Sequence, residues 1–327
     1  MKAWKAVALA TLMASAQAQS SAGNLDVRWD EGAADCAATQ WTPLQVHAFD
    51  ERTFILRQSP CASFEANFLY LLVGNDRALL VDTGAVADAG RMPLARRVLE
   101  LVPTRNGARL PLVVAHTHSH GDHREGDAQF ASLPDVRIVP TDLDGVRRFY
   151  GLPQWPEGVA QFDLGGRVVN VLPAPGHNPN HVVFHDEATG LLLTGDFLLP
   201  GRLTVDDAKA FEASANRVAA FVRDRPVSHV LGGHVELDRE GHLYPHGATH
   251  HPDERALPLT KADVLALPQA LDDFNGFYAS HPSFVLTNPL RNLAAVAIGA
   301  LVLLALAVWL LVRWIRRRRR ARVAPGG

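Results

Sequence analysis

The chain has 327 residues, of which 47% are hydrophobic, which suffices for one or two domains with a buried core. Of its 32 basic residues, ten lie within 1–18 or 291–327. Residues 19–290 therefore carry 22 basic against 34 acidic residues, a net charge of −12. An acidic body repels polyanions, so the composition argues against nucleic acid as a partner.

The first 18 residues have the features of a secretory signal peptide. Two lysines precede a short apolar core at 6–13, and a small-residue cleavage pattern ends at Ala18. An uncleaved N-terminal anchor is the alternative, but the apolar core is too short to span a bilayer. Residues 19–42 are small, polar and irregular, so we expect an irregular lead-in there.

Short apolar or alternating runs predict strands at 44–49, 53–57, 67–73, 77–81, 110–115, 136–139, 159–164, 168–172, 181–185, 191–194 and 227–231. Apolar residues at helical spacing predict helices at 86–102, 124–130, 142–150, 206–222 and 259–278. Strands and helices alternate in two successive groups. This order predicts one mixed α/β domain over residues 43–280.

The C-terminal region has the pattern of a membrane anchor. Residues 281–292 are predicted to be a juxtamembrane linker, and 293–312 are 20 uncharged residues, about 30 Å of helix. The arginine-rich segment 313–327 is typical of a basic cytoplasmic tail. A nucleic-acid patch is the alternative, but a position next to a span favours contact with anionic lipid. We therefore expect the α/β domain to be exported to the periplasm and anchored to a bacterial inner membrane by a C-terminal helix.

The chain has two cysteines, Cys36 and Cys61. An even count in an exported protein favours a disulfide over free thiols. The bond would close a loop of about 25 residues and stabilise the fold by roughly 3 kcal/mol.

Residues 116–123, with the sequence HTHSHGDH, concentrate four imidazoles and one carboxylate directly after a predicted strand. The carboxyl edge of a strand is where α/β sheets bind ligands. His118 and His120 can share one side of an extended segment, while Gly121 allows a tight turn before Asp122 and His123. Imidazole and carboxylate donors suit a borderline divalent ion such as zinc.

This His-x-His-x-Asp-His pattern resembles the metallo-β-lactamase superfamily. Four further motif positions follow the family order between about Phe68 and His234. They are Asp82 in LVDTG, His177 in APGH, Asp196 in LTGD and His234 in LGGH. The resemblance implies an α/β fold, a four-layer αββα sandwich (the metallo-β-lactamase fold), here with one C-terminal transmembrane helix.

Two zinc ions, with manganese or iron as alternatives, are what the resemblance implies. His118, His120 and His177 would bind one ion. Asp122, His123 and His234 would bind the second, and Asp196 would bridge both. Two ions held in this way can share a hydroxide that attacks a carbonyl. Asp122 and Asp196 are therefore the expected catalytic carboxylates, with Asp122 also able to relay a proton.

Other polar residues receive weaker predictions. Asp82 and His116 are expected to support the metal ligands without binding an ion, with a turn or helix cap and simple packing as their alternatives. Arg202 and Tyr244 are candidate substrate contacts. The histidine-rich segment 240–252 is interpreted as a solvated loop, with a cover over the metal site or a metal-uptake tract as alternatives.

The residue at position 196 distinguishes branches of the superfamily, because true β-lactamases usually carry Cys or Ser at the matching position. An aspartate resembles the glyoxalase II and lactonase-like branch. The resemblance thus implies a binuclear zinc-dependent hydrolase of a small ester, thioester or lactone. Its alternatives are β-lactam hydrolysis, a phosphodiesterase, which the acidic body disfavours, and a non-catalytic membrane-tethered metal-binding module. The expected partners are a small-molecule acyl substrate and the membrane, and the oligomeric state stays open.

Overall fold

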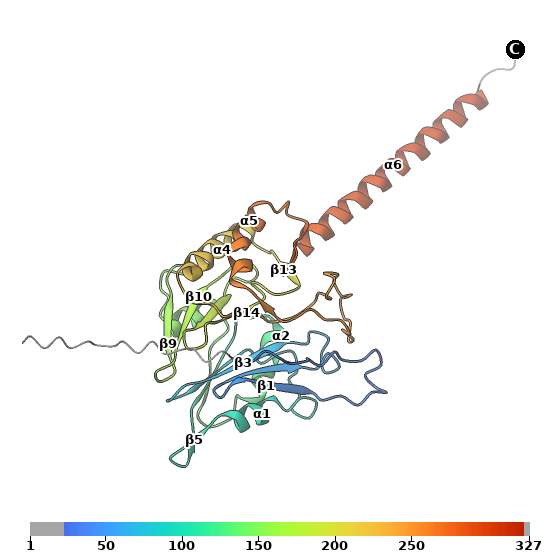
Figure 1. The fold of residues 1–327 in the computed structure, drawn as a ribbon. Helices are drawn as coiled ribbons and strands as arrows, with labels where there is room; N and C mark the ends of the chain where they lie inside the picture. Colours follow the sequence, from blue (N-terminus) through green and yellow to red (C-terminus); the bar gives the residue numbers. More distant parts are fainter. Residues whose placement is uncertain (1–22, 324–327) are drawn as a thin grey trace, which may run out of the picture.

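The computed structural model describes residues 23–323. Two six-stranded sheets pack face to face with helices outside (Figure 1). The first sheet has, in spatial order, β1 (Leu44–Asp50), β2 (Thr53–Gln58), β3 (Phe68–Val73), β4 (Ala78–Val81), β7 (Leu112–Ala115) and β8 (Val136–Ile138). The second has β15 (Pro258–Leu259), β14 (His229–Gly232), β12 (Leu191–Gly195), β11 (Val182–Asp186), β10 (Val168–Pro173) and β9 (Ala160–Asp163).

Seven helical segments flank the sheets or extend from them: α1 (Leu94–Leu101), α2 (Gly121–Arg124), the 3-10 helix η1 (Glu125–Gln129), α3 (Leu143–Tyr150), α4 (Ala208–Arg223), α5 (Lys261–Asp272) and α6 (Pro289–Val323). A third sheet has the order β13 (Arg202–Thr204), β17 (Val285–Thr287), β16 (Tyr278–Ser280). The strands β5 (Thr104–Arg105) and β6 (Ala108–Arg109) form a separate hairpin that the sequence pattern did not predict.

The core lies in three layers, and strand β3 shows why. Side chains alternate across a strand, and here both faces are covered. Phe68, Tyr70 and Leu72 face the second sheet, whereas Leu69 and Leu71 pack toward α1. The outer face of the second sheet is covered in the same way by α4 and α5. This arrangement is the expected four-layer αββα sandwich.

Parallel strand pairs bring distant motifs to one edge. In the first sheet β4 pairs with β7, and Val81 lies opposite Ala115. In the second sheet β12 pairs with β14, and Gly195 lies opposite Gly232. Because parallel strands end at the same edge of a sheet, the residues that follow each pair are neighbours. Gly233 N–H also donates to the Gly195 carbonyl at 2.9 Å, which fixes the second pair beyond the strands.

Three predicted segments differ in the structure. The helix expected over 86–102 begins only at Leu94, because the preceding Pro93 stands at its N-cap. The helix expected over 259–278 ends at Asp272, and Tyr278 begins β16. Residues 281–292, expected as a linker, contain β17 and the first turn of α6.

The N-terminal residues before β1 are irregular from residue 23 onward, and a disulfide joins Cys36 to Cys61 as expected. The predicted signal peptide, residues 1–18, lies outside the described residues. Helix α6 projects away from the domain (Figure 1). Its residues Pro289–Arg318 are long and apolar enough to cross a membrane, and none of the apolar window is buried in the protein.

Candidate metal centre

Strand β7 delivers the histidine-rich motif to the edge where the parallel strands end. The chain leaves β7 at Ala115, runs through an extended loop, and turns into α2 at Gly121. His120 at the N-cap is extended, with φ −62° and ψ 150°, and the next residues are helical. The change of direction at Gly121 separates His118 and His120 from Asp122 and His123. One short segment therefore supplies donors to two neighbouring groups.

The first donor group consists of three imidazoles. His118 Nε2 lies 2.9 Å from His120 Nδ1, and His177 Nε2 lies 3.1 Å from that same atom. His177 comes from the loop after β10, far from the motif in sequence. All three side chains are the set that the sequence assigned to one ion, and their donor atoms lie within 4.8 Å of one another.

The second donor group combines imidazoles with carboxylates. Asp122 Oδ2 lies 3.1 Å from His123 Nε2 and 3.3 Å from His234 Nε2. The two imidazole nitrogens are 3.3 Å apart. His234 follows β14, so again the sheet edge brings a distant residue to the motif. Together with Asp196, these residues match the set that the sequence assigned to the second ion.

Asp196 lies between the two groups and faces both. Its Oδ1 is 3.3 Å from His123 Nε2 and 3.5 Å from His234 Nε2. Its Oδ2 is directed to the first group, 3.6 Å from His177 Nε2 and 4.0 Å from His118 Nε2. One carboxylate therefore offers one oxygen to each donor group.

Three of the five donor imidazoles are held through Nδ1 by oxygen acceptors. His123 Nδ1–H donates to Asp82 Oδ2 at 2.9 Å, and His177 Nδ1–H donates to the Thr204 carbonyl at 3.1 Å. His234 Nδ1–H donates to the Glu65 carbonyl at 2.6 Å. These bonds direct the Nε2 of His123, His177 and His234 into the cluster, and Nε2 is the nitrogen that an ion would take from each.

The electrostatics of the cluster favour a cation. Burial alone would raise the pKa of Asp196, but His123 and His234 hold it below its usual range, so the carboxylate is ionised. Burial opposes protonation of His234, yet Asp196 and Asp122 raise its pKa to about 10. The same negative potential that attracts a proton to His234 Nε2 attracts a divalent ion.

The protonation and hydrogen bonding of the donor atoms also fit divalent ions. Asp196 Oδ1 is buried and has no hydrogen-bond partner among the described residues. Burial and the neighbouring imidazoles of His123 and His181 lower the pKa of His118 well below its ordinary value, so His118 is neutral and offers a lone pair. Unpartnered buried acceptors are costly unless a cation or a donor satisfies them. Nitrogen and carboxylate donors of this kind suit zinc-type ions.

Asp82 contacts His123 directly, whereas His116 contacts Asp127, and the supporting role of both residues stays a prediction. Asp82 accepts hydrogen bonds from the Thr117 backbone N–H at 2.7 Å and its hydroxyl at 2.9 Å, besides the bond from His123. Its left-handed φ of 65° directs it back under the motif. His116 faces away from both donor groups and contacts Asp127 Oδ1 at 2.8 Å.

Some contributors were not identified from the sequence. The carbonyls of Glu65 and Thr204 orient ligands through backbone atoms, which carry no residue signature. His181 was placed only within the strand expected over 181–185, and in the structure its ring stacks on His118 with centroids 4.9 Å apart. Both of its ring nitrogens are buried without a partner among the described residues. Its position four residues after His177 was the only available signal.

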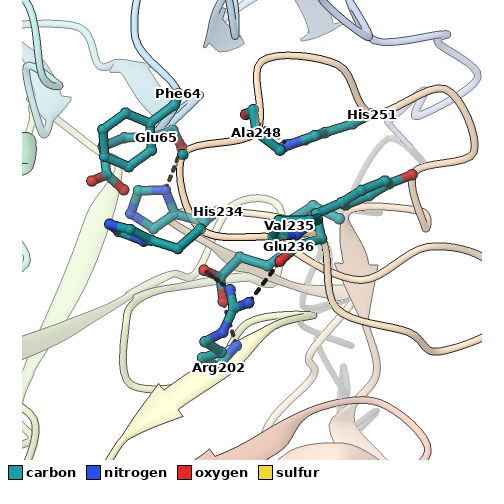
Figure 2. A pocket seen from close by; sticks show the side chains of 12 residues that line it. Phe64, Glu65, Arg202, His234, Val235, Glu236, Ala248 and His251 are labelled. Carbon is teal, nitrogen blue, oxygen red and sulfur yellow. Dashed lines mark hydrogen bonds and ion pairs between the residues drawn. The ribbon is translucent and has the colours of Figure 1, made fainter. Parts of the chain in front are cut away.

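A small pocket opens beside His234 (Figure 2). Arg202 and Tyr244, the weakly predicted substrate contacts, both line it, together with Phe64 and Glu65. The Arg202 guanidinium is engaged by Glu236 at 2.8 Å and by the Tyr244 carbonyl at 2.7 Å. The pocket therefore holds an arginine whose charge is already matched by a carboxylate.

The histidine-rich segment 240–252 forms one wall of this pocket. His246 contacts the Phe64 ring edge-on at 5.1 Å, and His251 stacks on Tyr244 at 4.3 Å. His242 instead lies out in solvent beside Asp238. The segment is thus partly a solvated loop, as favoured from the sequence, and partly a wall of the pocket next to the metal centre.

Comparisons with known proteins agree with this geometry. Residues 64–242 match the family model described as Metallo-beta-lactamase superfamily. A hydroxyacylglutathione hydrolase from Cereibacter sphaeroides is 28% identical over 171 residues, which is 50% of this chain and 61% of that protein. One from Anaeromyxobacter dehalogenans is 34% identical, over 40% of this chain and 46% of that protein. The chain thus spans about half the length of these two curated relatives.

A solved metallo-β-lactamase structure from Hirschia baltica is similar at 17% identity with a TM-score of 0.45, covering 59% of this chain and 91% of that one. The hydrolase names of the relatives support the predicted class of metal-dependent hydrolase. The family match covers more than half of the chain and includes the cluster from His118 to His234. The chain therefore belongs to the metallo-β-lactamase superfamily.

Proposed function

We propose that the chain is a binuclear zinc-dependent hydrolase of a small ester, thioester or lactone. The observation that carries this proposal is Asp196, whose two oxygens face two separate donor groups. Residue by residue, His118, His120 and His177 would hold one ion and Asp122, His123 and His234 the other. Bound ions of this type polarise a carbonyl and lower the pKa of water toward about 7.

The residues of this chain have distinct tasks in such a site. The acceptors on Asp82, Thr204 and Glu65 fix the imidazoles in the orientation that leaves each Nε2 free. Asp196 holds the two donor groups together. Asp122 is kept ionised by His123 and His234, although burial opposes this, and its pKa lies well below the usual range. The ionised carboxylate is therefore available as a ligand, and the proton relay expected for it from the sequence stays a prediction.

The substrate class is supported from two directions. An aspartate at position 196 resembles the acyl-ester and thioester branches, and curated relatives are named for hydrolysis of a hydroxyacylglutathione. The body of the chain carries a net negative charge, which disfavours phosphodiesters of nucleic acids. Superfamily membership alone leaves β-lactam hydrolysis as the second candidate, so a direct comparison of substrates is required.

We further propose that the domain is exported and held at a membrane by α6. The disulfide between Cys36 and Cys61 is typical of an oxidising compartment. The apolar part of α6 is fully exposed in the protein, and burial in a bilayer would remove that surface from water. These features support a periplasmic domain on a bacterial inner membrane.

The test combines metal content with a substrate panel. The full chain in detergent should bind about two zinc ions and cleave an acyl thioester or lactone faster than a cephalosporin or a phosphodiester. Asp196→Ala should lose one ion and lower kcat by about 100-fold or more, because both donor groups lose their shared carboxylate. Asp127→Asn, which changes a carboxylate beside His116, is the matched control.

Two results would contradict the proposal. An Asp196→Ala chain that keeps two ions and the wild-type rate would remove the bridging role. A wild-type chain that binds two ions but cleaves none of the four substrate classes would favour a metal-binding module without turnover.

A further inference from the structure

Helix α6 joins the domain without a flexible linker. Strand β17 ends at Thr287, and Asn288 immediately caps the helix, accepting a hydrogen bond from the Arg291 N–H at 2.9 Å. The same buried Asn288 side chain donates to the Val205 carbonyl at 2.7 Å. Asn292, one turn along the helix, donates to the Phe277 carbonyl at 3.1 Å. The first turn of α6 is therefore fixed to the third sheet.

The strand that leads into α6 pairs with the strand that helps to position the metal centre. β17 pairs in parallel with β13, and the two strands lie beside the start of α6 (Figure 1). Thr204 in β13 accepts the hydrogen bond from His177, and Val205, the next residue, accepts the bond from Asn288. Two adjacent residues of the chain therefore contact a candidate metal ligand and the start of α6.

The surface around this junction is unusually apolar for an exposed edge. Phe277 and Tyr278 are 45% and 52% exposed, and Leu290, in the first turn of α6, is 72% exposed. Tyr278 belongs to β16, which is an edge strand of the third sheet. Aromatic side chains next to a membrane span are characteristic of the interface between lipid and water. These side chains adjoin the exposed apolar surface of α6. The bilayer that would cover α6 is therefore the surface that would also cover Phe277 and Tyr278.

We infer that Phe277 and Tyr278 rest on the bilayer that α6 enters, and that the metal centre takes acyl substrates dissolved in that bilayer. The inference rests on the proposed hydrolase activity for its substrate. Because the helix is fixed to β17 and β13, the pocket wall at Arg202 is held at a set distance from the lipid surface. A long-chain ester, thioester or lactone could then reach the site while its hydrocarbon chain stays in the membrane.

The surface is tested by site-specific labelling of the full chain in nanodiscs that hold one protein each. Both native cysteines are in the disulfide, so a single introduced cysteine reacts alone. A fluorophore on Phe277→Cys should be quenched by lipids that carry a nitroxide near the headgroup. Val159→Cys, equally exposed at 45% but next to β9, should not be quenched.

Equal quenching at both positions would overturn the docking surface. Quenching that occurs only in discs with two chains would show that Phe277 and Tyr278 contact a second copy of the chain. That result would also overturn the proposed contact with lipid.

The substrate class is tested with two nitrophenyl esters that differ only in chain length. For Phe277→Ser/Tyr278→Ser, kcat/KM for the hexadecanoyl ester in nanodiscs should fall about tenfold, because the domain loses its contact with lipid. Turnover of the water-soluble butanoyl ester should stay within about twofold of wild type, which also shows that the variant is folded.

An unchanged rate on the hexadecanoyl ester would overturn the membrane-substrate inference. A wild-type chain that cleaves neither ester, nor the thioester and lactone of the earlier panel, would instead contradict the proposed function. The labelling result would then still decide the docking surface.

Discussion

From the hydrogen bond between Asp82 and His123 we predict that Asp82 raises the affinity of the site for metal ions. Asp82 Oδ2 accepts a hydrogen bond from His123 Nδ1–H at 2.9 Å, so His123 directs Nε2, the nitrogen that an ion would take, at Asp122 and Asp196. The other carboxylate oxygen accepts the Thr117 backbone N–H at 2.7 Å. Asp82→Asn keeps the shape of this side chain but replaces one of the two acceptors with an NH2 donor.

In either orientation of the new amide, its NH2 group faces another hydrogen-bond donor. If its NH2 faces His123, the imidazole must protonate Nε2 and loses the lone pair that an ion needs. If the NH2 faces Thr117, a buried backbone N–H loses its acceptor. A lost charge-assisted hydrogen bond costs about 1.5–3 kcal/mol. That corresponds to a 10–100-fold loss of metal affinity, the range found for supporting partners of metal-binding histidines.

The assay is a competition for zinc between the metal-free full chain in detergent and a chromophoric chelator. Asp82→Asn should raise the Kd of the ion held by His123 by about 10–100-fold. Asp127→Asn is the control, since Asp127 contacts His116, which belongs to neither donor group. Its Kd should stay within about threefold of wild type. If Asp82→Asn binds both ions as tightly as this control, Asp82 does not set the tautomer of His123.

Three further predictions concern stability. Arg57→Met should lower the free energy of unfolding by about 3–5 kcal/mol, because the Glu254 carboxylate, bound at 2.9 Å, would be left buried without its partner. Arg57→Met/Glu254→Leu should recover most of this loss in denaturant unfolding, and equal stability of both variants would refute the pairing. Cys36→Ser/Cys61→Ser should cost about 3 kcal/mol, since the bond closes a separation of 25 residues. Reductant should destabilise wild type by the same amount and leave this variant unchanged. Burial and the Arg57 guanidinium lower the pKa of His251 to about 4, and its Nδ1 has no partner among the described residues. A lowered histidine pKa stabilises the fold above the unfolded value of about 6.5, and this contribution is lost as pH falls toward 4. Tm should therefore fall less between pH 7 and pH 5 for His251→Asn than for wild type, and parallel pH profiles would show that His251 does not contribute.

The sequence alone determined the chemistry of the centre and most of its scaffold. The His118–His123 motif was identified because metal-type donors follow a predicted strand, and the distant His177, Asp196 and His234 were identified from their resemblance to the motif order of the superfamily. Buried strands such as β3 were visible as continuous apolar runs. The candidate span at 293–312 was visible because a membrane requires an uninterrupted apolar stretch of defined length.

Only the tertiary structure decided how these parts meet. Backbone carbonyls at Glu65 and Thr204 orient imidazoles, and a carbonyl is the same in every residue. The contact of His181 with His118 depends on the register of β11 against the loop after β7, which no local pattern fixes. The expected linker at 281–292 proved to contain a strand, because β17 pairs with the neighbouring β16 and with β13, which lies far away in the sequence. Short segments depend on distant partners, so their structure is settled by packing rather than by their own sequence.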